Sequence, residues 1–106
     1  ALAELFLSQN SFSGEIDLTH LPKTMQTLDL GFNKLCGRVD LSNLRSVMKF
    51  LYSDQNPFEG MTDFSCLPDS LYELNVSDTK LEGTIYVAKR DRHVYTANSH
   101  VTMLLD

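Results

Sequence analysis

Residues 25–41 read MQTLDLGFNKLCGRVDL, and residues 48–64 read MKFLYSDQNPFEGMTDF, with similar residue types in the same order. The pattern continues on both sides, as LAELFLSQNSFSGEIDL at 2–18 and LYELNVSDTKLEGTIYV at 71–87. The four windows lie 23 residues apart and align without a gap. A fixed period of this kind is the signature of stacked structural repeats. We therefore predict a coil of stacked turns whose function lies on a surface rather than in a pocket.

The apolar residues and the asparagines of these windows give the coil a physical basis. A Leu-x-Leu pair is a period-two signal that predicts a strand of about three to five residues. One turn cannot bury its own leucines, but stacked turns form a continuous core. Asn10, Asn33 and Asn56 are expected to point inward and to bond backbone groups of their own and the adjacent turn, because buried polar groups are paired. Thr79 replaces Asn in the fourth window and, being shorter, predicts a looser rung.

The L-x-x-L-x-L-x-x-N-x-L core of these windows resembles the leucine-rich-repeat family, whose periods run from roughly 20 to 29 residues. The glycine two residues after the Phe or Leu is similar to the plant-type and protist variants. The resemblance covers about residues 2–87. It implies an α/β-type solenoid, a right-handed coil with short parallel β-strands on its concave face and irregular or 3₁₀ segments on its convex face. It also divides the chain into four tandem repeats and a final segment, at about 1–24, 25–47, 48–70 and 71–88, then 89–106.

Two further columns share the period, one of glycine and one of aspartate: Gly14, Gly37, Gly60 and Gly83, and Asp17, Asp40 and Asp63. The glycines are expected where the backbone needs a positive φ or where the next turn comes close. The aspartates precede Leu-x-x-Leu or Phe-x-x-Leu, and we interpret them as N-caps of short helical or 3₁₀ turns. The alternative is a line of cation ligands, which carboxylates stacked about 5 Å apart would oppose by repulsion. No metal or other cofactor is expected.

The repeat becomes irregular in 89–106, which we interpret as a degenerate fifth repeat or a C-terminal cap. Three cationic residues stand where apolar ones are expected: Lys89, Arg90 and Arg92. They either screen the last core ring from water or form a small basic patch for an acidic partner. Val94 lies 23 residues after Leu71, and Leu104 lies 23 residues after Leu81. Both are expected to continue those columns.

Composition limits the classes of function. The chain has 106 residues, enough for one domain, and 42% of them are hydrophobic. Its net charge of −5 disfavours nucleic acid, which requires a basic face, and no apolar run approaches the roughly 18 residues of a membrane span. Cys36 and Cys66 occupy different repeat positions, so we expect no disulfide between them and favour an intracellular location. The chain begins inside a full repeat, so we expect a fragment of a longer array, whose uncapped end is able to stack on another copy.

Alternation within each strand directs the leucines inward and their neighbours, Thr27 among them, outward. Parallel stacking at about 4.8 Å places the outward side chains on one concave wall. Aromatic and acidic residues stand out there, and we predict that they bind the partner: Phe6, Asp29, Phe32, Phe50, Tyr52, Asp54, Glu73 and Asp78. Exposed aromatics are costly in a monomer unless they are used, and they are enriched in binding hot spots. The alternative is that neighbouring aromatics cover one another across strands without a partner.

The functional prediction follows from this surface and from the motifs that the sequence lacks. No G-x-S-x-G, P-loop, H-E-x-x-H or C-x-x-C is present, so we do not expect an enzyme. We predict a non-catalytic protein–protein interaction module that binds a protein or peptide with basic and apolar residues. One alternative is a structural spacer in a longer repeat scaffold or surface protein. A second is a module that recruits substrate within a larger enzyme. Neither nucleic acid nor a membrane is expected as a partner.

Overall fold

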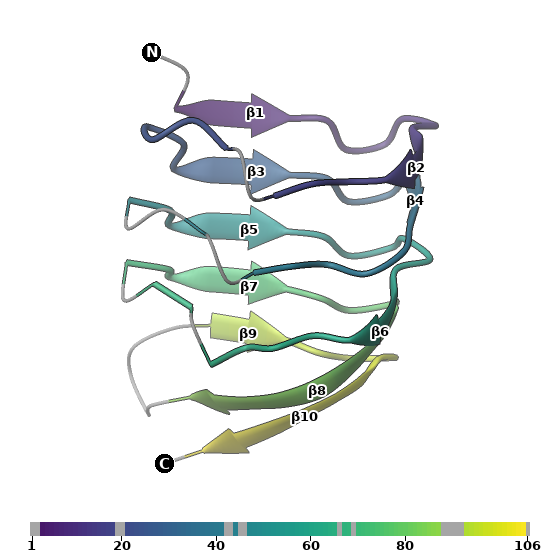
Figure 1. The fold of residues 1–106 in the computed structure, drawn as a ribbon, viewed down its shortest axis with the longest axis vertical. Coiled ribbons are helices and arrows are strands. Elements are labelled where there is room, and N and C mark those ends of the chain that lie inside the picture. Colours follow the sequence, from purple (N-terminus) through teal and green to yellow (C-terminus); the bar gives the residue numbers. More distant parts are fainter. Residues whose placement is uncertain are drawn as a thin grey trace.

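The computed structural model describes residues 3–18, 21–41, 44, 47–65, 67–68, 70–87 and 93–105. In these ranges every regular element is a β-strand, and the chain winds through the strands as a parallel β-solenoid (Figure 1). Successive turns lie one above the other along the long axis, from the N-terminus at the top to the C-terminus at the bottom. The molecule measures 36 × 31 × 19 Å.

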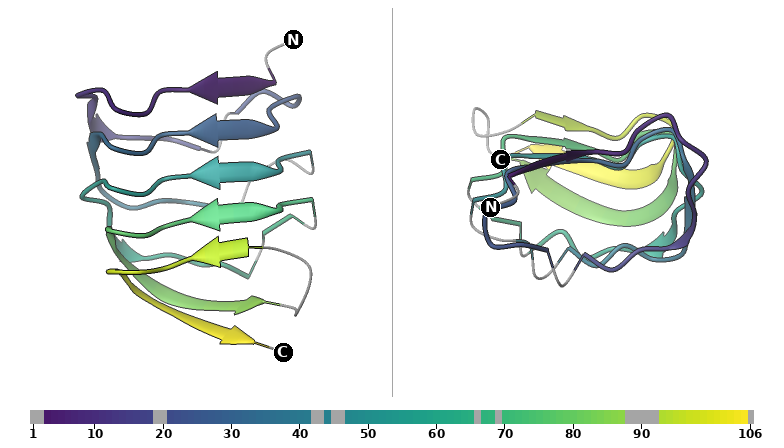
Figure 2. Two further views of the ribbon diagram at one scale, coloured as in Figure 1. Left: turned by 180° about the vertical axis from the view of Figure 1, so that it is seen from behind. Right: turned by 90° about the horizontal axis from the view of Figure 1, so that it is seen from above.

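One strand from each of five turns forms a parallel sheet in the order β1-β3-β5-β7-β9 (Figure 2, left). The strands are β1 (Glu4–Phe6), β3 (Thr27–Asp29), β5 (Phe50–Tyr52), β7 (Glu73–Asn75) and β9 (His93–Tyr95). Across the first four strands each residue pairs with the one 23 positions later. The leucines at the strand centres therefore form one column: Leu5, Leu28, Leu51 and Leu74. The predicted stacking of the four windows is confirmed.

The other strands lie on a neighbouring side of the coil, beyond a bend. β2 (Ser13–Glu15) pairs with β4 (Lys34–Cys36), and β6 (Glu59–Met61), β8 (Lys80–Val87) and β10 (His100–Leu105) form a sheet in the order β10-β8-β6. Seen from above, β8 and β10 cross inside the outline of the preceding turns (Figure 2, right). Their inward side chains are buried, including Leu81, Ile85 and Val101. These two strands therefore lie across the C-terminal end of the apolar core.

Asn33 and Asn56 form hydrogen bonds between turns, as predicted, but the prediction is wrong for Asn10, which is exposed and donates to carbonyl oxygens of its own turn. The Asn33 side-chain nitrogen lies 2.9 Å from the Leu7 carbonyl oxygen of the preceding turn and 3.0 Å from the Leu30 carbonyl oxygen of its own turn. The Asn33 Oδ1 accepts a hydrogen bond from the Phe12 backbone N–H at 3.2 Å. One buried amide thus satisfies backbone groups of two turns where no strand ladder is available.

The next two rungs differ from each other. Asn56 repeats the arrangement, since it donates to the Leu30 carbonyl oxygen at 2.9 Å and accepts from the Leu35 N–H at 3.1 Å. The Thr79 hydroxyl instead donates to the Val76 carbonyl oxygen of its own turn at 2.7 Å. The shorter side chain of Thr79 therefore completes a bend without the cross-turn link that Asn supplies.

The glycine column adopts the positive φ values that the sequence predicts. They are 90°, 84°, 93° and 138° at Gly14, Gly37, Gly60 and Gly83. At Gly83 the backbone of the preceding turn also comes close, because a Cβ there would lie 2.6 Å from the Thr62 carbonyl oxygen. Glycine is needed at this position for two independent reasons.

The α/β part of the predicted fold class is wrong for the described residues, which contain neither an α-helix nor a 3₁₀-helix. A capping bond does form at Asp63, whose Oδ1 accepts hydrogen bonds from the N–H and the hydroxyl of Ser65 at 2.9 and 2.6 Å. These bonds hold the pKa of Asp63 below its ordinary value. The aspartate supports a turn here, but the described residues after it contain no helix. Within the described ranges no helix has the length and apolar character needed to cross a membrane.

The expected register of the last turn is also wrong. Val94 pairs with Leu74, an offset of 20 residues, and so does not continue the Leu71 column. The second side agrees: β6 pairs with β8 at an offset of 21 residues, but β8 pairs with β10 at 18, and Leu104 pairs with Tyr86. Both sheets therefore show a final turn that is three residues shorter. Lys89, Arg90 and Arg92, expected as a cap or a basic patch, lie outside the described residues, as does Cys66.

Candidate binding face

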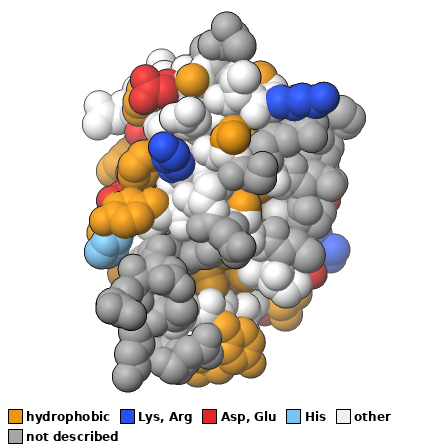
Figure 3. All heavy atoms as spheres, turned by 90° about the vertical axis from the view of Figure 1, so that its left-hand side faces the viewer, with side chains coloured by type: hydrophobic (Ala, Val, Ile, Leu, Met, Phe, Trp, Pro, Cys, Tyr) orange, Lys and Arg blue, Asp and Glu red, His pale blue; other side chains and the backbone are white. Residues whose placement is uncertain are grey.

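The outer face of the five-stranded sheet carries the side chains that flank the central leucines. Two columns cross the strands there: Glu4, Thr27, Phe50, Glu73 and His93, and Phe6, Asp29, Tyr52, Asn75 and Tyr95. We use "outer face" for these two columns together with the turn residues that follow the strands. In Figure 3 this face is seen edge-on, and hydrophobic and acidic side chains gather along the left border.

Aromatic rings form a continuous row on the outer face. The rings of Phe50 and Tyr52 are nearly parallel, with centroids 6.4 Å apart. Tyr72, just before β7, meets Phe50 edge-on at 6.0 Å and the His93 ring at 5.0 Å. The His93 Nε2 also lies 3.2 Å from the Tyr72 hydroxyl. We call these four residues the aromatic row; it spans β5 to β9 and joins three turns.

Tyr52 is fixed in this row by a hydrogen bond to the next strand. Its hydroxyl donates to the Glu73 Oε2 at 2.6 Å. Burial raises the pKa of Tyr52 well above its usual value of 10.0, and the bond to Glu73 and the Glu73 charge raise it further. The phenol therefore remains a donor at any physiological pH. Two of the predicted site residues, Tyr52 and Glu73, form one rigid unit.

A recess of about 270 Å³ opens beside Tyr52, where the strands turn out of the sheet. Its lining residues come from four turns: Ser8, Gln9, Asp29, Phe32, Tyr52, Asp54 and Asn75. Burial raises the pKa of Asp54; a bond from its own backbone N–H lowers it, and the charges of Asp29 and Asp78 raise it again. The structure thus brings four predicted residues together around one concavity that carries concentrated negative charge.

The residues after the strands have an unusual backbone conformation that the sequence does not reveal. A positive φ of 56–58° recurs in one column without glycine: Gln9, Phe32, Gln55, Asp78 and Asn98. Phe32 therefore extends from a turn beside β3 rather than from the strand itself. Asp78 accepts hydrogen bonds from the side-chain amides of Gln55 and Asn98, the latter at 2.9 Å. Its charge is held by neighbouring turns, unlike that of Asp54.

The other predicted residues vary in exposure. Phe6 and Phe32 are 61% and 51% exposed, whereas Phe50 and Tyr52 are half-buried by the aromatic row. Thr27 was expected to face solvent but is only 6% exposed, since it is a small side chain between two larger neighbours in register, Glu4 and Phe50. An outward position in a strand therefore does not guarantee an accessible side chain.

The sequence-based site omitted Tyr72, His93 and Tyr95. Tyr72 precedes its strand, yet it contacts Phe50 of the preceding turn and His93 of the following turn. His93 and Tyr95 were hidden by the shorter last turn, which moves the columns by three residues. The aromatic character of residues 93–95 was the available signal, but a constant 23-residue period assigned them to other positions.

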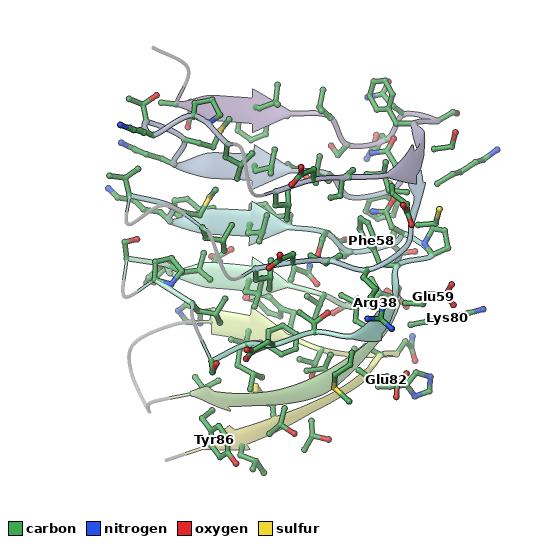
Figure 4. The ribbon with its side chains drawn as sticks, in the orientation of Figure 1. Arg38, Phe58, Glu59, Lys80, Glu82 and Tyr86 are labelled. Atoms are coloured by element: carbon green, nitrogen blue, oxygen red, sulfur yellow. The ribbon has the colours of Figure 1, made fainter. Side chains whose placement is uncertain are left out.

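A second hollow lies on the side formed by β2, β4, β6, β8 and β10, with a volume of about 760 Å³. Arg38, Glu59, Lys80 and Glu82 project from this side (Figure 4) and line the hollow with Glu15 and His100. Positive and negative side chains alternate along it, so it presents no single charge to a partner. The outer face is the more distinctive surface, because the described residues that line its recess include acids and aromatic rings but no Lys, Arg or His.

Comparisons with protein-family models, curated proteins and solved structures return no match for this chain. The assignment of function therefore depends on the geometry and chemistry of the described residues.

Proposed function

We propose that this chain is a non-catalytic protein-binding module of the leucine-rich-repeat type, and that it binds a protein or peptide partner on its outer face. The observation that carries the proposal is the aromatic row, with exposed Phe6 and Phe32 on the same outer face and carboxylates around the row. Aromatic side chains dominate binding hot spots because they bury a large area with little loss of side-chain freedom.

The rigidity of the scaffold supports the same proposal. Each strand of the five-stranded sheet is hydrogen-bonded to its neighbours, and buried asparagines tie the first three turns together. A face held in this way loses little conformational entropy when a partner binds, so more of the contact energy appears as affinity. The repeated Leu and Asn columns support the leucine-rich-repeat assignment.

The competing role is a structural spacer, and one observation favours it. Tyr72 contacts both Phe50 and His93, so the three rings join three turns, which stabilises a sheet without any partner. If the chain is a spacer, the aromatic row stabilises the fold and binds no partner. The two roles predict different consequences when the rings are removed, because a spacer loses stability and has no ligand to lose.

The test is a comparison of partner capture by matched variants. Phe50→Ala/Tyr52→Ala removes two rings of the outer face, and Met61→Ala/Tyr86→Ala removes two exposed apolar side chains from the other side. We expect proteins retained by the wild type to be retained by the Met61/Tyr86 variant and lost by the Phe50/Tyr52 variant, with both variants folded by circular dichroism. Equal retention by both variants, or equal loss from both, would refute the outer face as the binding surface.

A further inference from the structure

The recess beside Tyr52 has a lining that specifies the chemistry of the group it accepts. We infer that it binds the guanidinium group of an arginine in an extended segment of the partner, with Asp29 and Asp54 as the anionic pair and Phe32 and Tyr52 as the aromatic walls. The inference rests on the proposed function and narrows it from a protein partner to one with an exposed arginine.

The two carboxylates converge on the same point above Gly31. A Cβ placed on Gly31 would lie 2.8 Å from the Asp54 Oδ1 and 3.3 Å from the Asp29 Oδ1. The Asp29 Oδ1 is held there by a hydrogen bond from the Gly31 N–H at 3.0 Å. The missing side chain of Gly31 leaves room for both acids on the floor of the recess. Two adjacent acceptors suit the planar fork of a guanidinium, which donates to carboxylates in pairs.

The charge of this pair is not balanced within the lining. No Lys, Arg or His is among the lining residues that the structure describes, and Asp78 adds a third negative charge nearby. Part of the Asp54 side chain is removed from water, and the raised pKa of Asp54 reports the cost of holding its charge there. A cation that enters the recess would offset this repulsion, which gives its binding an electrostatic gain that the second, mixed-charge hollow does not offer.

The aromatic walls favour arginine over lysine. Phe32 and Tyr52 line the recess, and Phe32 is half exposed. A guanidinium stacks on aromatic rings and is weakly hydrated, whereas an ammonium is a strongly hydrated point charge. Exposed Phe6 lies in the same column as Asp29 and Tyr52 and provides an apolar contact next to the recess. The fitting segment therefore places an apolar residue close to its arginine.

The experiment uses a fluorescein-labelled peptide of repeated Val-Arg-Gly units and the same peptide with citrulline, the neutral isostere, in place of arginine. Binding is followed by fluorescence anisotropy with the wild type, Asp54→Asn and Glu82→Gln. The last variant loses the same charge from the other side of the coil (Figure 4). We expect the wild type and Glu82→Gln to bind the arginine peptide alike. Asp54→Asn should bind it about 10-fold more weakly, and the citrulline peptide should bind the wild type at least as weakly.

Any of the following results in the peptide assay would overturn the inference: equal binding of the arginine and citrulline peptides, equal loss in Asp54→Asn and Glu82→Gln, or no saturable binding to the wild type. Saturable binding of Ca²⁺ alone that Asp54→Asn abolishes would also overturn it, since the recess would then be a metal site. Should Asp54→Asn fail to fold, Asp29→Asn replaces it, because the amide oxygen still accepts the Gly31 bond. If partner capture is lost in Phe50→Ala/Tyr52→Ala but kept in Asp54→Asn, arginine binding in the recess is rejected. The proposed binding of a partner on the outer face is then still supported.

Discussion

The first three turns and the last two turns of this coil are held together in different ways. In the first region, Asn33 and Asn56 each bond backbone groups of the preceding turn. In the second region, the described bonds of the Thr79 and Ser99 hydroxyls stay within their own turns. The backbone compensates, because β8 and β10 pair over six residues, whereas the strands of the other pairs match over three.

The difference shows that a repeat can transfer its inter-turn link from a side chain to the backbone. A buried amide is compact and suits a bend, whereas a longer parallel ladder needs an extended chain. β8 supplies that chain by continuing to Val87, and it crosses the end of the core as it does so. The same change of path accompanies the shortening of the last turn from 23 to 20 residues. Loss of the Asn rung and closure of the core therefore occur together.

The largest expected effect tests the asparagine ladder. Asn56→Ala leaves the Leu35 N–H without its side-chain partner in a buried setting, and it removes one of the two side-chain donors to the Leu30 carbonyl oxygen, of which Asn33 is the other. We expect a loss of about 2–4 kcal/mol in the free energy of unfolding, because buried unpaired groups keep their full desolvation cost. Thr79→Ala removes bonds within one turn only and should cost about 1 kcal/mol. Urea denaturation followed by circular dichroism gives both values.

Asn10 provides the control for this comparison. It is exposed, and among the described residues its amide donates only to the Leu7 and Ser8 carbonyl oxygens of its own turn. Asn10→Ala should therefore be nearly neutral, within about 0.5 kcal/mol, as for most surface substitutions. Similar losses in Asn10, Asn56 and Thr79 variants would show that the cross-turn bonds do not distinguish the two regions.

A somewhat smaller effect is expected as the difference between glycine substitutions in the two regions. Gly14→Ala and Gly83→Ala both place a side chain at positive φ, which costs about 1–2 kcal/mol. At Gly14 the new Cβ meets nothing within 4 Å, but at Gly83 it lies 2.6 Å from the Thr62 oxygen and 3.1 Å from the Phe64 ring. Gly83→Ala should therefore lose about 1–3 kcal/mol more than Gly14→Ala. Equal shifts in the urea midpoint would contradict the close packing at the closing turn.

Next in size is a stabilising change. Thr62 is 3% exposed, and its hydroxyl has no hydrogen-bond partner among the described residues. Val39 and Ile85 occupy the equivalent positions 23 residues away. Thr62→Val should raise the free energy of unfolding by about 1 kcal/mol, because it removes an unpaired buried polar group at constant shape. Thr79→Val should lower the free energy of unfolding, because the Thr79 hydroxyl is hydrogen-bonded. If both variants changed the free energy of unfolding in the same direction, the unpaired hydroxyl of Thr62 would not explain the gain.

Structural features of the coil could be predicted from the sequence where each one depends on a particular residue type. The leucine column, the glycine φ values and the asparagine rungs each need one kind of residue, so a single sequence revealed them. The column of residues with positive φ after the strands could not be predicted, because its members share no residue type: Gln9, Phe32, Gln55, Asp78 and Asn98. The recess was equally hidden, since it depends on the left-handed conformation of Phe32 and on the missing side chain of Gly31. The predicted register of the last turn was wrong, because a fixed 23-residue period carries no information about a turn that is three residues shorter.

The smallest effect concerns the alkaline stability of the outer face. Because the pKa of Tyr52 is raised in the fold by burial and by Glu73, the unfolded chain loses that proton first, near pH 10.0. Above this pH the unfolded state binds fewer protons than the folded state, so stability falls as pH rises. Tyr52→Phe removes this contribution and should lose stability less steeply than the wild type in urea titrations between about pH 9 and pH 11. Tyr86→Phe, changed at an exposed position on β8, serves as the control. A Tyr52→Phe slope identical to that of the wild type would mean that the phenol and Glu73 are not coupled, and that the aromatic row is looser than the hydrogen bond implies.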